Sequence, residues 1–489
     1  MRKIVNKPGQ NLTAKLEAFP YQYEAFDAIK DKSFAAIFHE QGLGKTKIAI
    51  DILLYWLEYK EIDTVLIVTK KQLVENWRGE FEIHTNILPR ILTNKRGENY
   101  YVFNSNTRIV ITNFETISGE KDRFKLFLKT RNVAIIIDES TKLKNPESKL
   151  TQDFFEISNL FKIRIIMTGT PVANRPYDIW AQIFFLDFGK SLGTNFAEFK
   201  STNDLSNDLA TNETKRNLFE TSVSKIFDKI KDFTVRETKN SGIITLPNKV
   251  YHDIYVDFED TQSLMYNKVR TEMQILLQHD EKTLLDESTD SIKRLLRLVQ
   301  ITSNPRLLDD LYCSFSGKEA KLDVLINEII SRDEKIIVWS IFTGNIDHFC
   351  KKYKNLNAVK ITGKMNIEDR TNSVRAFKTG DAKVLFATPQ SAKEGLTLTI
   401  ANNVIFYDRG FNLDDYLQAQ DRIHRISQTK ICHIYNIMVK NSIDIWIDQL
   451  LKAKQNAAFL AQGDYKLKKY TEVADYSFGE LVKDILNEN

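Results

Sequence analysis

The chain has 489 residues and 42% of them are hydrophobic, which is enough to fill two or more cores. Its 69 basic and 65 acidic residues leave a formal charge of +4, and this near balance neither supports nor excludes nucleic acid, since a local basic surface can hide in it. Three widely spaced cysteines, a polar N-terminus and no run of about 18 apolar residues argue against disulfides, a signal peptide and a membrane span, so we expect a cytoplasmic protein.

The first predicted element is an amphipathic helix start over Phe19–Lys30 (FPYQYEAFDAIK). Gln22 in this segment carries an amide that can pair with both the donor and the acceptor edge of adenine. An exposed glutamine without a ligand is the alternative, and this segment alone favours it. Only motifs further along the chain can decide between the two.

A candidate phosphate-binding loop comes next in Phe38–Thr46 (FHEQGLGKT), between the apolar run Phe34–Phe38 and the helix-like stretch Lys47–Tyr59. A strand, a tight loop and a helix start in this order place backbone N–H groups and a lysine around a triphosphate. The strict pattern has a glycine where this chain has His39. The loop alone therefore does not establish nucleotide binding.

Two continuous β-branched runs lie after the loop, Thr64–Thr69 and Arg108–Thr112, and both are typical of strands buried in a parallel sheet. Each run ends in polar residues. Open α/β sheets bind their ligands at the carboxyl edge of the strands. We therefore expect contacts with a phosphate backbone at this edge.

The next predicted strand, Val133–Ile137, leads directly into Asp138 and Glu139. Adjacent carboxylates at the end of a buried strand are costly unless a cation meets them. Together with the upstream loop, they predict that Asp138 holds the Mg²⁺ of a nucleotide and that Glu139 orients and deprotonates the attacking water. A merely solvated acidic pair is the alternative if the motif is taken alone.

A fourth strand, Arg164–Met167, ends at the small polar residues Thr168–Pro171 (TGTP). These residues either relay the state of the nucleotide to a neighbouring lobe or form a simple turn after the strand. The local sequence does not decide between the two interpretations.

Strand-like runs disappear between about residues 188 and 310, where long polar helical patterns indicate a helical insertion with a crossing segment near Thr245–Lys249. A second α/β lobe is the economical explanation for the residues after this insertion. Its strand-like runs are Lys335–Trp339, Ala358–Ile361, Lys383–Ala387 and Asn403–Tyr407.

Near the end of this second lobe, Gln418–Gln428 (QAQDRIHRISQ) places Arg422 and Arg425 three residues apart. This spacing predicts that the two side chains share one face of a helix. Two guanidinium groups presented together suit the γ-phosphate and its transition-state charge, as an arginine finger does. Solvated surface arginines are the alternative.

Six motifs in order resemble those of superfamily 2 helicases, and specifically their Swi/Snf-type DNA-translocase branch: FPYQ, HEQGLGKT, DEST, TGTP, GLTLT and QAQDRIHRISQ. The phrases IIMTGTPVANRPYDIW and NVIFYDRGFNLDDYLQAQDRIHRISQTK are especially similar to that branch. The match spans roughly residues 19 to 450, and the order of the motifs argues strongly against coincidence.

This resemblance implies an α/β fold with two RecA-like parallel-sheet lobes and helical insertions between them. The first lobe would occupy residues 1–188, the insertions and the lobe-crossing segment 189–315, the second lobe 316–455, and a C-terminal tail 456–489. ATP and Mg²⁺ would bind between the lobes, so that hydrolysis requires them to close.

The resemblance also implies the residues of this site. The predicted nucleotide-binding residues are Gln22, Gly42, Leu43, Gly44, Lys45, Thr46, Gly395 and Gln418. The predicted Mg²⁺ residues are Thr46 and Asp138. The predicted catalytic residues are Lys45, Asp138, Glu139, Arg422 and Arg425. The residues in or beside nucleic-acid-contacting motifs are Lys70, Thr112, Ser340 and Thr388.

The expected function is that of an ATP-driven double-stranded DNA translocase that remodels forked or branched DNA in replication, recombination or repair. The short segments outside the motifs leave no room for a histone reader, so we expect a compact fork-remodelling or branch-migration enzyme of a bacterium or a phage-infected host, not a nucleosome remodeller. The alternatives are a nucleotide-gated DNA clamp that does not translocate and an RNA helicase.

The chain departs from the family pattern at several positions. Thr141 stands where the family usually has histidine, and Ser427 replaces the usual glycine of the arginine motif. Phe411 and Leu413 replace the usual tryptophan and proline, and His39 replaces a usual acidic residue. The catalytic charges are all present, so we predict an active ATPase.

Overall fold

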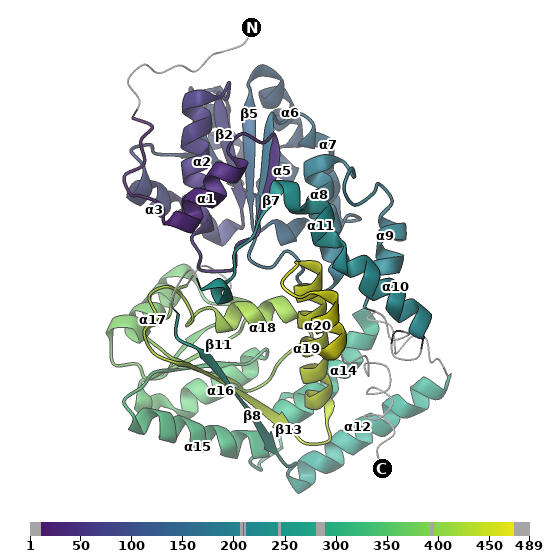
Figure 1. Ribbon diagram of the computed structural model, residues 1–489. Helices are drawn as coiled ribbons and strands as arrows, with labels where there is room; N and C mark the ends of the chain where they lie inside the picture. The colour runs from purple at the N-terminus through teal and green to yellow at the C-terminus, as the bar shows by residue number, and fades with distance from the viewer. Residues whose placement is uncertain are drawn as a thin grey trace. The chain divides into compact units, whose positions relative to one another are not determined.

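The computed structural model describes residues 11–205, 209, 212–242, 246–279, 289–391 and 396–473 (Figure 1). The chain divides into two compact units. The first comprises Met1–Asp204, Phe219–Thr245 and Ala458–Leu467, and the second comprises Leu205–Leu218, Leu246–Ala457 and Lys468–Asn489. Each unit has its own sheet.

Among the described residues, the sheet of the first unit has seven parallel strands in the order β3-β4-β2-β5-β6-β1-β7. The strands are β1 (Phe34–Ile37), β2 (Thr64–Thr69), β3 (Arg90–Ile91), β4 (Ile109–Asn113), β5 (Val133–Asp138), β6 (Ile163–Met167) and β7 (Thr234–Val235). Every strand predicted in this half of the chain is present within a residue or two. The two strands that the sequence did not reveal, β3 and β7, are only two residues long.

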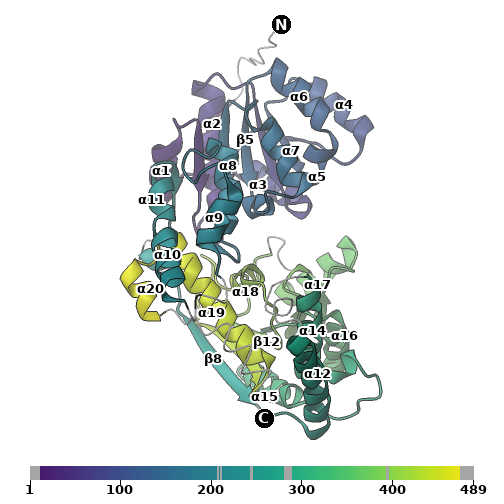
Figure 2. The ribbon, with the colours of Figure 1, turned by 90° about the vertical axis from the view of Figure 1, so that its right-hand side faces the viewer.

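Helices cover both faces of this sheet (Figure 2). One face carries α1 (Pro20–Ile29), α2 (Lys45–Tyr59) and α3 (Val74–His84). The other face carries α5 (Phe114–Gly119), α6 (Lys121–Thr130), α7 (Lys149–Ser158) and α8 (Trp180–Asp187), and α4 (Arg96–Asn104) follows β3. Because both faces are covered, β2, β4, β5 and β6 are buried at every position, which is why their sequences read as continuous apolar runs.

The strand register brings the predicted functional segments of the first unit to one edge. On one side of β5 lies β2, with Val68 opposite Ile137, and on the other side lies β6, with Asp138 opposite Met167. Strand β1 pairs with β6 through Ile37 and Met167. The loop after β1 and the carboxylates after β5 therefore leave the sheet at the same carboxyl edge, where α/β proteins bind ligands.

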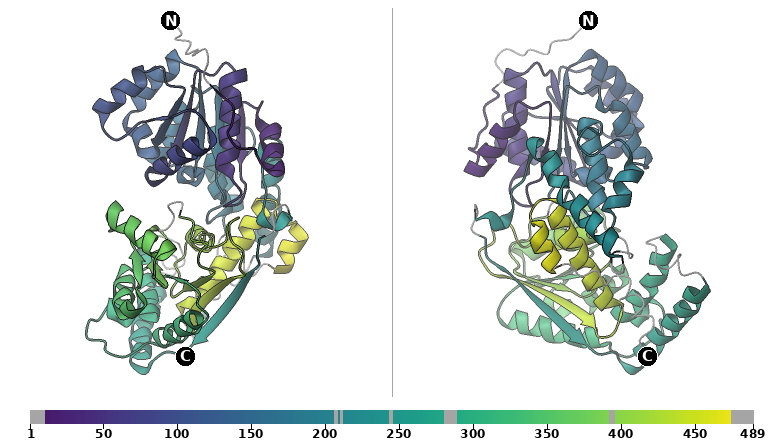
Figure 3. Two further views of the ribbon diagram at one scale, coloured as in Figure 1. Left: turned by 90° about the vertical axis from the view of Figure 1, so that its left-hand side faces the viewer. Right: turned by 45° about the vertical axis from the view of Figure 1, so that its right-hand side comes forward.

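The second unit contains a six-stranded parallel sheet among its described residues, in the order β10-β11-β9-β12-β13-β8. The strands are β8 (Lys249–Val256), β9 (Ile336–Trp339), β10 (Val359–Ile361), β11 (Val384–Ala387), β12 (Asn403–Phe406) and β13 (Cys432–Val439). Figure 3 shows β8 lying beside β13 at the edge of this sheet.

Alternate residues of the second sheet enter two separate cores. Ile337 and Trp339 pack in a cluster with residues of α17 (Ile367–Thr379) and α18 (Leu413–Gln420), whereas Ile336 packs with α15 (Gly317–Ser331) and α16 (Thr343–Lys352). This alternation is the two-residue period of a strand. The prediction of two α/β lobes with parallel sheets is therefore confirmed.

The remaining helices lie before, between and after the strands of the second unit or in the segment that links the two sheets. They are α9 (Phe196–Asn203), α10 (Glu213–Ser224), α11 (Ile226–Ile230), α12 (Asp260–His279), α14 (Thr289–Ser303), α19 (Ile443–Ala461) and α20 (Leu467–Val473). In the described part of the chain, none of the helices has the length and apolar character that crossing a membrane requires.

Candidate nucleotide-binding site

The loop after β1 has the backbone of an anion-binding turn. Gly42 and Gly44 have φ values of 87° and 70°, a region that residues with a Cβ rarely adopt. Gly44 is also the N-cap residue of α2, so the position before this helix carries no capping side chain. A glycine-rich loop that leads into a helix start is the arrangement that binds phosphate through backbone N–H groups.

Gln22 packs against this loop. Its side chain is only 3% exposed, so the alternative of a surface glutamine is wrong. The amide nitrogen lies 3.4 Å from the Leu43 carbonyl oxygen, and its oxygen accepts a 3.0 Å hydrogen bond from the Phe19 backbone N–H. A Cβ on Gly44 would come within 2.2 Å of the Gln22 amide nitrogen. A side chain at this position would therefore displace the Gln22 amide, and the φ of 70° favours glycine independently.

Lys45 lies at the first position of α2, and its ammonium folds back over the loop. It donates to the His39 carbonyl at 2.9 Å and to the Glu40 carbonyl at 3.3 Å. The next residue, Thr46, is half-buried on the first turn of the helix. A Cβ on Gly169 would lie 3.3 Å from the Lys45 ammonium nitrogen, so the TGTP segment after β6 packs directly against this loop.

Asp138 is held by three hydrogen bonds at the end of β5. Its Oδ2 accepts from the Trp77 indole N–H at 2.8 Å and from the Thr69 hydroxyl at 3.1 Å, and its Oδ1 accepts from the Glu139 backbone N–H at 2.9 Å. Burial raises the pKa of Asp138 and the neighbouring Glu139 charge raises it further, whereas the Trp77 bond and the charge of Lys45 lower it. The pKa of Asp138 is raised overall, because burial is the largest of these effects.

Glu139 follows in the left-handed region, with a φ of 55°. This conformation is uncommon for a residue with a side chain and is a form of strain that concentrates at functional sites. It ends β5 and turns the Glu139 side chain toward Lys70, whose ammonium lies 3.3 Å from Oε2. The next residue, Ser140, donates to Gln182, which in turn donates to the Pro171 carbonyl, so the acidic motif is linked to the TGTP segment.

The predicted Mg²⁺ fits the donor set of this site. In the described residues, no group of three or more His, Cys, Asp or Glu side chains is arranged to hold a metal ion by itself. Mg²⁺ at nucleotide sites takes one or two protein oxygen ligands and completes its shell with phosphates and water. The Asp138 carboxylate and the Thr46 hydroxyl are such oxygen donors, so both would hold the ion, which when bound neutralises charge on the phosphates.

His39 has a physical explanation that the sequence did not provide. Its ring is 2% exposed, and burial together with the charge of Lys45 lowers its pKa to about 4, so it is neutral at physiological pH. The nearby Arg236 donates to the Phe38 carbonyl at 2.8 Å and forms a two-armed ion pair with Asp464. Asp464 supplies the counter-charge for Arg236, so a neutral His39 does not leave this arginine without an acidic partner.

The two arginines of the second unit do not share a helical face, so this prediction is wrong. Helix α18 ends at Gln420, and Arg422 and Arg425 lie in the turns that follow. The helix ends here because the backbone beyond Gln420 bonds to a distant segment. The Arg422 carbonyl accepts a 2.9 Å hydrogen bond from the Leu398 N–H. Arg422 is 3% exposed, whereas Arg425 is half-buried and donates to the Thr397 hydroxyl at 2.7 Å.

Two further predicted nucleotide residues belong to the second unit. Gln418 is 1% exposed and donates to Asp414 Oδ1 at 2.7 Å. Gly395 lies outside the described residues. Ser427, which replaces a usual glycine, shares a 2.8 Å hydrogen bond with Thr399.

The four residues predicted to contact nucleic acid have different surroundings. Lys70 is partly exposed beside Glu139. Thr388 is mostly buried and its hydroxyl donates to Ser391 at 2.8 Å. Thr112 and Ser340 are fully buried. The Ser340 hydroxyl donates to Asp408 at 2.6 Å, so it belongs to a buried polar cluster of the second unit.

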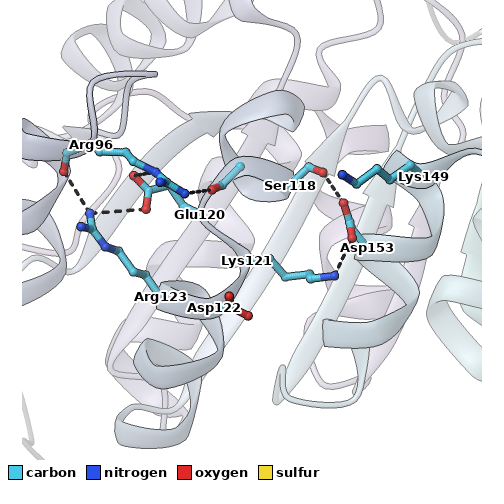
Figure 4. Close-up of a pocket in the computed structure, with 9 residues that line it drawn as sticks. Arg96, Ser118, Glu120, Lys121, Asp122, Arg123, Lys149 and Asp153 are labelled. Atoms are coloured by element: carbon cyan, nitrogen blue, oxygen red, sulfur yellow. Dashed lines mark hydrogen bonds and ion pairs between the residues drawn. The ribbon is translucent and has the colours of Figure 1, made fainter.

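A separate pocket of about 340 Å³ lies in the first unit, by the starts of α4, α6 and α7 (Figure 4). Several of its charged side chains are paired. Arg123 contacts Glu120 at 3.4 Å, and Lys121 contacts Asp153 at 2.7 Å. These pairs offset much of the basic charge, and the described residues that line the pocket lack the glycine-rich turn into a helix that the phosphate loop has.

Trp77 is a positioning residue that the sequence did not reveal. Replacing it with phenylalanine keeps a smaller aromatic ring but removes the N–H that holds Asp138, and a hydrogen bond to a charged group contributes about 1.5–3 kcal/mol. We expect kcat/KM for ATP to fall about 10-fold or more, which corresponds to about 1.4 kcal/mol or more. Steady-state ATPase assays over a range of Mg²⁺ concentrations measure this effect.

The matched control is Trp56→Phe. The Trp56 indole also donates one hydrogen bond, a partly buried one at 2.9 Å to the Lys30 carbonyl, and is not among the hydrogen-bond donors to Asp138. Both variants should lose similar stability in thermal unfolding, whereas only Trp77→Phe should lose activity. Equal kinetic effects in the two variants would remove Trp77 from the site.

Comparison with known proteins agrees with this geometry. The model of the SNF2-related domain matches residues 30–307, which is more than half of the chain. The chain belongs to the SNF2-related family. The model of the helicase conserved C-terminal domain matches residues 320–427 of this SNF2-family chain, which covers most of the second sheet. The resemblance found in the sequence is therefore confirmed.

Relatives of this SNF2-family chain include an uncharacterized ATP-dependent helicase of Mycoplasma pneumoniae, 29% identical over 89% of this chain and 41% of the relative. The ISWI chromatin-remodeling complex ATPase ISW1 of Saccharomyces cerevisiae is 25% identical over 93% of this chain and 42% of the relative. The chain thus spans about two fifths of the length of these relatives. The solved Sulfolobus solfataricus SWI2/SNF2 ATPase core in complex with dsDNA is similar with a TM-score of 0.43 and 22% identity, over 96% of this chain and 99% of that chain.

Proposed function

We propose that this SNF2-family chain is an ATP-driven translocase that acts on double-stranded DNA. The observation that carries the proposal is that the phosphate loop with Lys45 and the acidic pair with Asp138 leave the first sheet at the same carboxyl edge, on either side of β6. Gln22 lies against the same loop. ATP hydrolysis requires groups that bind the phosphates, contact the adenine base and activate the attacking water, all in one place.

In the proposed reaction, the N–H groups at the start of α2 and the Lys45 ammonium bind the β- and γ-phosphates. Asp138 is oriented by its three hydrogen-bond donors and, with Thr46, would hold Mg²⁺, which would supply positive charge against the phosphates. Glu139 accepts a proton from the attacking water, and the bond between the γ-phosphorus and the bridging oxygen breaks to give ADP and phosphate. Arg425 and Arg422 neutralise the charge that develops on the transferred group.

The proposed track is duplex DNA, and forked or branched duplexes are the finer substrate that the sequence resemblance favours. Lys70 and Thr388 are the proposed backbone contacts with the best support, since Lys70 is partly exposed at the carboxyl edge and Thr388 follows directly after β11. The relatives named as a helicase and as a chromatin-remodeling ATPase support a nucleic-acid motor of this general kind.

Steady-state ATPase assays with duplex, forked and single-stranded DNA and with RNA test the proposal. We expect duplex or forked DNA to stimulate ATP hydrolysis, and the stimulated rate to depend on the length of the DNA. Lys45→Ala should abolish this hydrolysis. If stimulation is independent of track length, the chain is a nucleotide-gated clamp. If RNA stimulates and duplex DNA does not, it is an RNA helicase.

A further inference from the structure

One ion pair joins a predicted DNA contact to the predicted catalytic base. Lys70 is the first residue after β2 and Glu139 is the first residue after β5, and these strands are neighbours in the sheet of the first unit. The Lys70 ammonium nitrogen lies 3.3 Å from Glu139 Oε2. The two side chains are 24% and 18% exposed, so the pair is partly shielded from solvent.

This pair engages one of the two Glu139 carboxylate oxygens and fixes the direction of the side chain. A general base must accept a hydrogen bond from the attacking water, and an ammonium group that already donates to the carboxylate competes with that water. The backbone of Glu139 is fixed by its φ of 55° and by its N–H bond to Asp138. The feature that can change is therefore the partner of the side chain.

Lys70 is suited to leave this pair. Its ammonium group is carried on a flexible four-carbon stem. The 3.3 Å separation from Glu139 is longer than the 2.7–2.9 Å of a strong charge-assisted hydrogen bond. Duplex DNA presents a dense row of phosphates that attract such a cation. A phosphate at this edge can therefore compete with Glu139 for Lys70.

We propose that Lys70 is a positioning residue that holds Glu139 in an unreactive pairing until a DNA phosphate takes over its ammonium group. This inference rests on the proposed function of the site. It provides a direct route by which DNA stimulates hydrolysis within the first unit. In the DNA-free protein, the pair keeps the carboxylate from the water. In the DNA-bound protein, Glu139 is released to accept a proton.

The test compares ATP hydrolysis by wild type, Lys70→Ala and Lys70→Gln with and without duplex DNA. If Lys70 only contacts DNA, its replacement should not raise the hydrolysis rate in the absence of DNA. If Lys70 restrains Glu139, its replacement should raise that rate. We expect the DNA-free rate to rise about 5-fold in both variants, the size of effect that a partly exposed ion pair supports. The DNA concentration for half-maximal stimulation should rise as well, because a backbone contact is lost.

The matched control is Lys142→Ala. It removes a lysine that pairs with Glu115 at 3.4 Å, nearly the same length, only three residues from Glu139. Its DNA-free rate should equal that of wild type. Raising the salt concentration should increase the DNA-free rate of wild type, by screening the Lys70–Glu139 pair, and leave Lys70→Ala unchanged. Binding of a fluorescent ATP analogue shows that each variant retains its nucleotide site.

The outcomes separate this inference from the proposed function. If duplex DNA does not stimulate the wild type, the proposed function fails. If DNA stimulates the wild type but the Lys70 variants lose stimulation without a higher DNA-free rate, Lys70 is only a DNA contact and the inference is overturned. Unchanged DNA-free rates in the Lys70 variants together with unchanged salt dependence overturn it equally.

Discussion

Replacing Glu139 with glutamine is expected to reduce ATP turnover by about 10²–10⁴-fold, the usual contribution of a general base. The amide has nearly the same shape as the carboxylate but cannot take a proton from water. Lys45 and the N–H groups of the phosphate loop are unchanged, so ATP should still bind. Steady-state ATPase assays with saturating duplex DNA, together with equilibrium binding of a fluorescent ATP analogue, measure the two properties separately.

Glu115→Gln is the control for this variant. Glu115 also follows a strand of the first sheet, and its carboxylate pairs with Lys142 at 3.4 Å, so the substitution removes an equivalent charge away from Asp138. It should hydrolyse ATP at the wild-type rate. Normal hydrolysis by Glu139→Gln would show that another group activates the water, and loss of ATP binding would point to a structural defect.

The sequence was sufficient for most strands that are buried on both faces, although the buried strand β13 was missed. Thr64–Thr69 and Val133–Asp138 are strands because their apolar runs match a sheet covered by helices on each side. The two glycines of the phosphate loop were informative because their positive φ values restrict the residue type. Asp138 and Glu139 were recognisable because two carboxylates at the end of a buried strand are costly unless a cation pairs with them.

Edge strands and irregular turns were harder to predict. Strand β8 is an edge strand with half of its residues exposed, so Lys249–Val256 lacks a continuous apolar run and was included in a helical insertion. The helix expected across Arg422 and Arg425 ends early because a distant segment, Leu398, bonds to its continuation. Spacing within a motif does not show where a helix stops when a tertiary contact decides it.

Residues that act through distant partners gave no signal in the sequence. Trp77 and Asp138 are 61 positions apart, and Arg236 and Asp464 are 228 apart. Each pair exists only because the fold brings two elements together, and single tryptophans or aspartates have no characteristic spacing. The sequence held only a weak indication of the Trp77–Asp138 bond. Trp77 lies in the helix that follows β2, and β2 is the neighbour of the strand that carries the acidic pair.

Replacing Arg425 with alanine is expected to reduce DNA-stimulated turnover by about 10³-fold or more, the usual effect of losing an arginine finger. Among the two arginines of the motif, Arg425 is the better candidate because it is half-buried, whereas Arg422 is 3% exposed. Its hydrogen bonds to the Thr397 hydroxyl and the Asp421 carbonyl orient the guanidinium. ATP binding should be nearly intact, since Gln22, Lys45 and the phosphate loop belong to the first unit.

Two comparisons make this prediction specific. Arg375→Ala removes an exposed arginine from α17 of the same unit and should leave turnover unchanged. Arg425→Lys keeps the charge but loses the planar fork that matches a phosphate, so it should recover only part of the activity. Single-turnover hydrolysis and binding of a fluorescent ATP analogue distinguish the steps. If Arg425→Ala loses binding and turnover together with thermal stability, the arginine supports the fold of the second unit and does not act on the transferred phosphate.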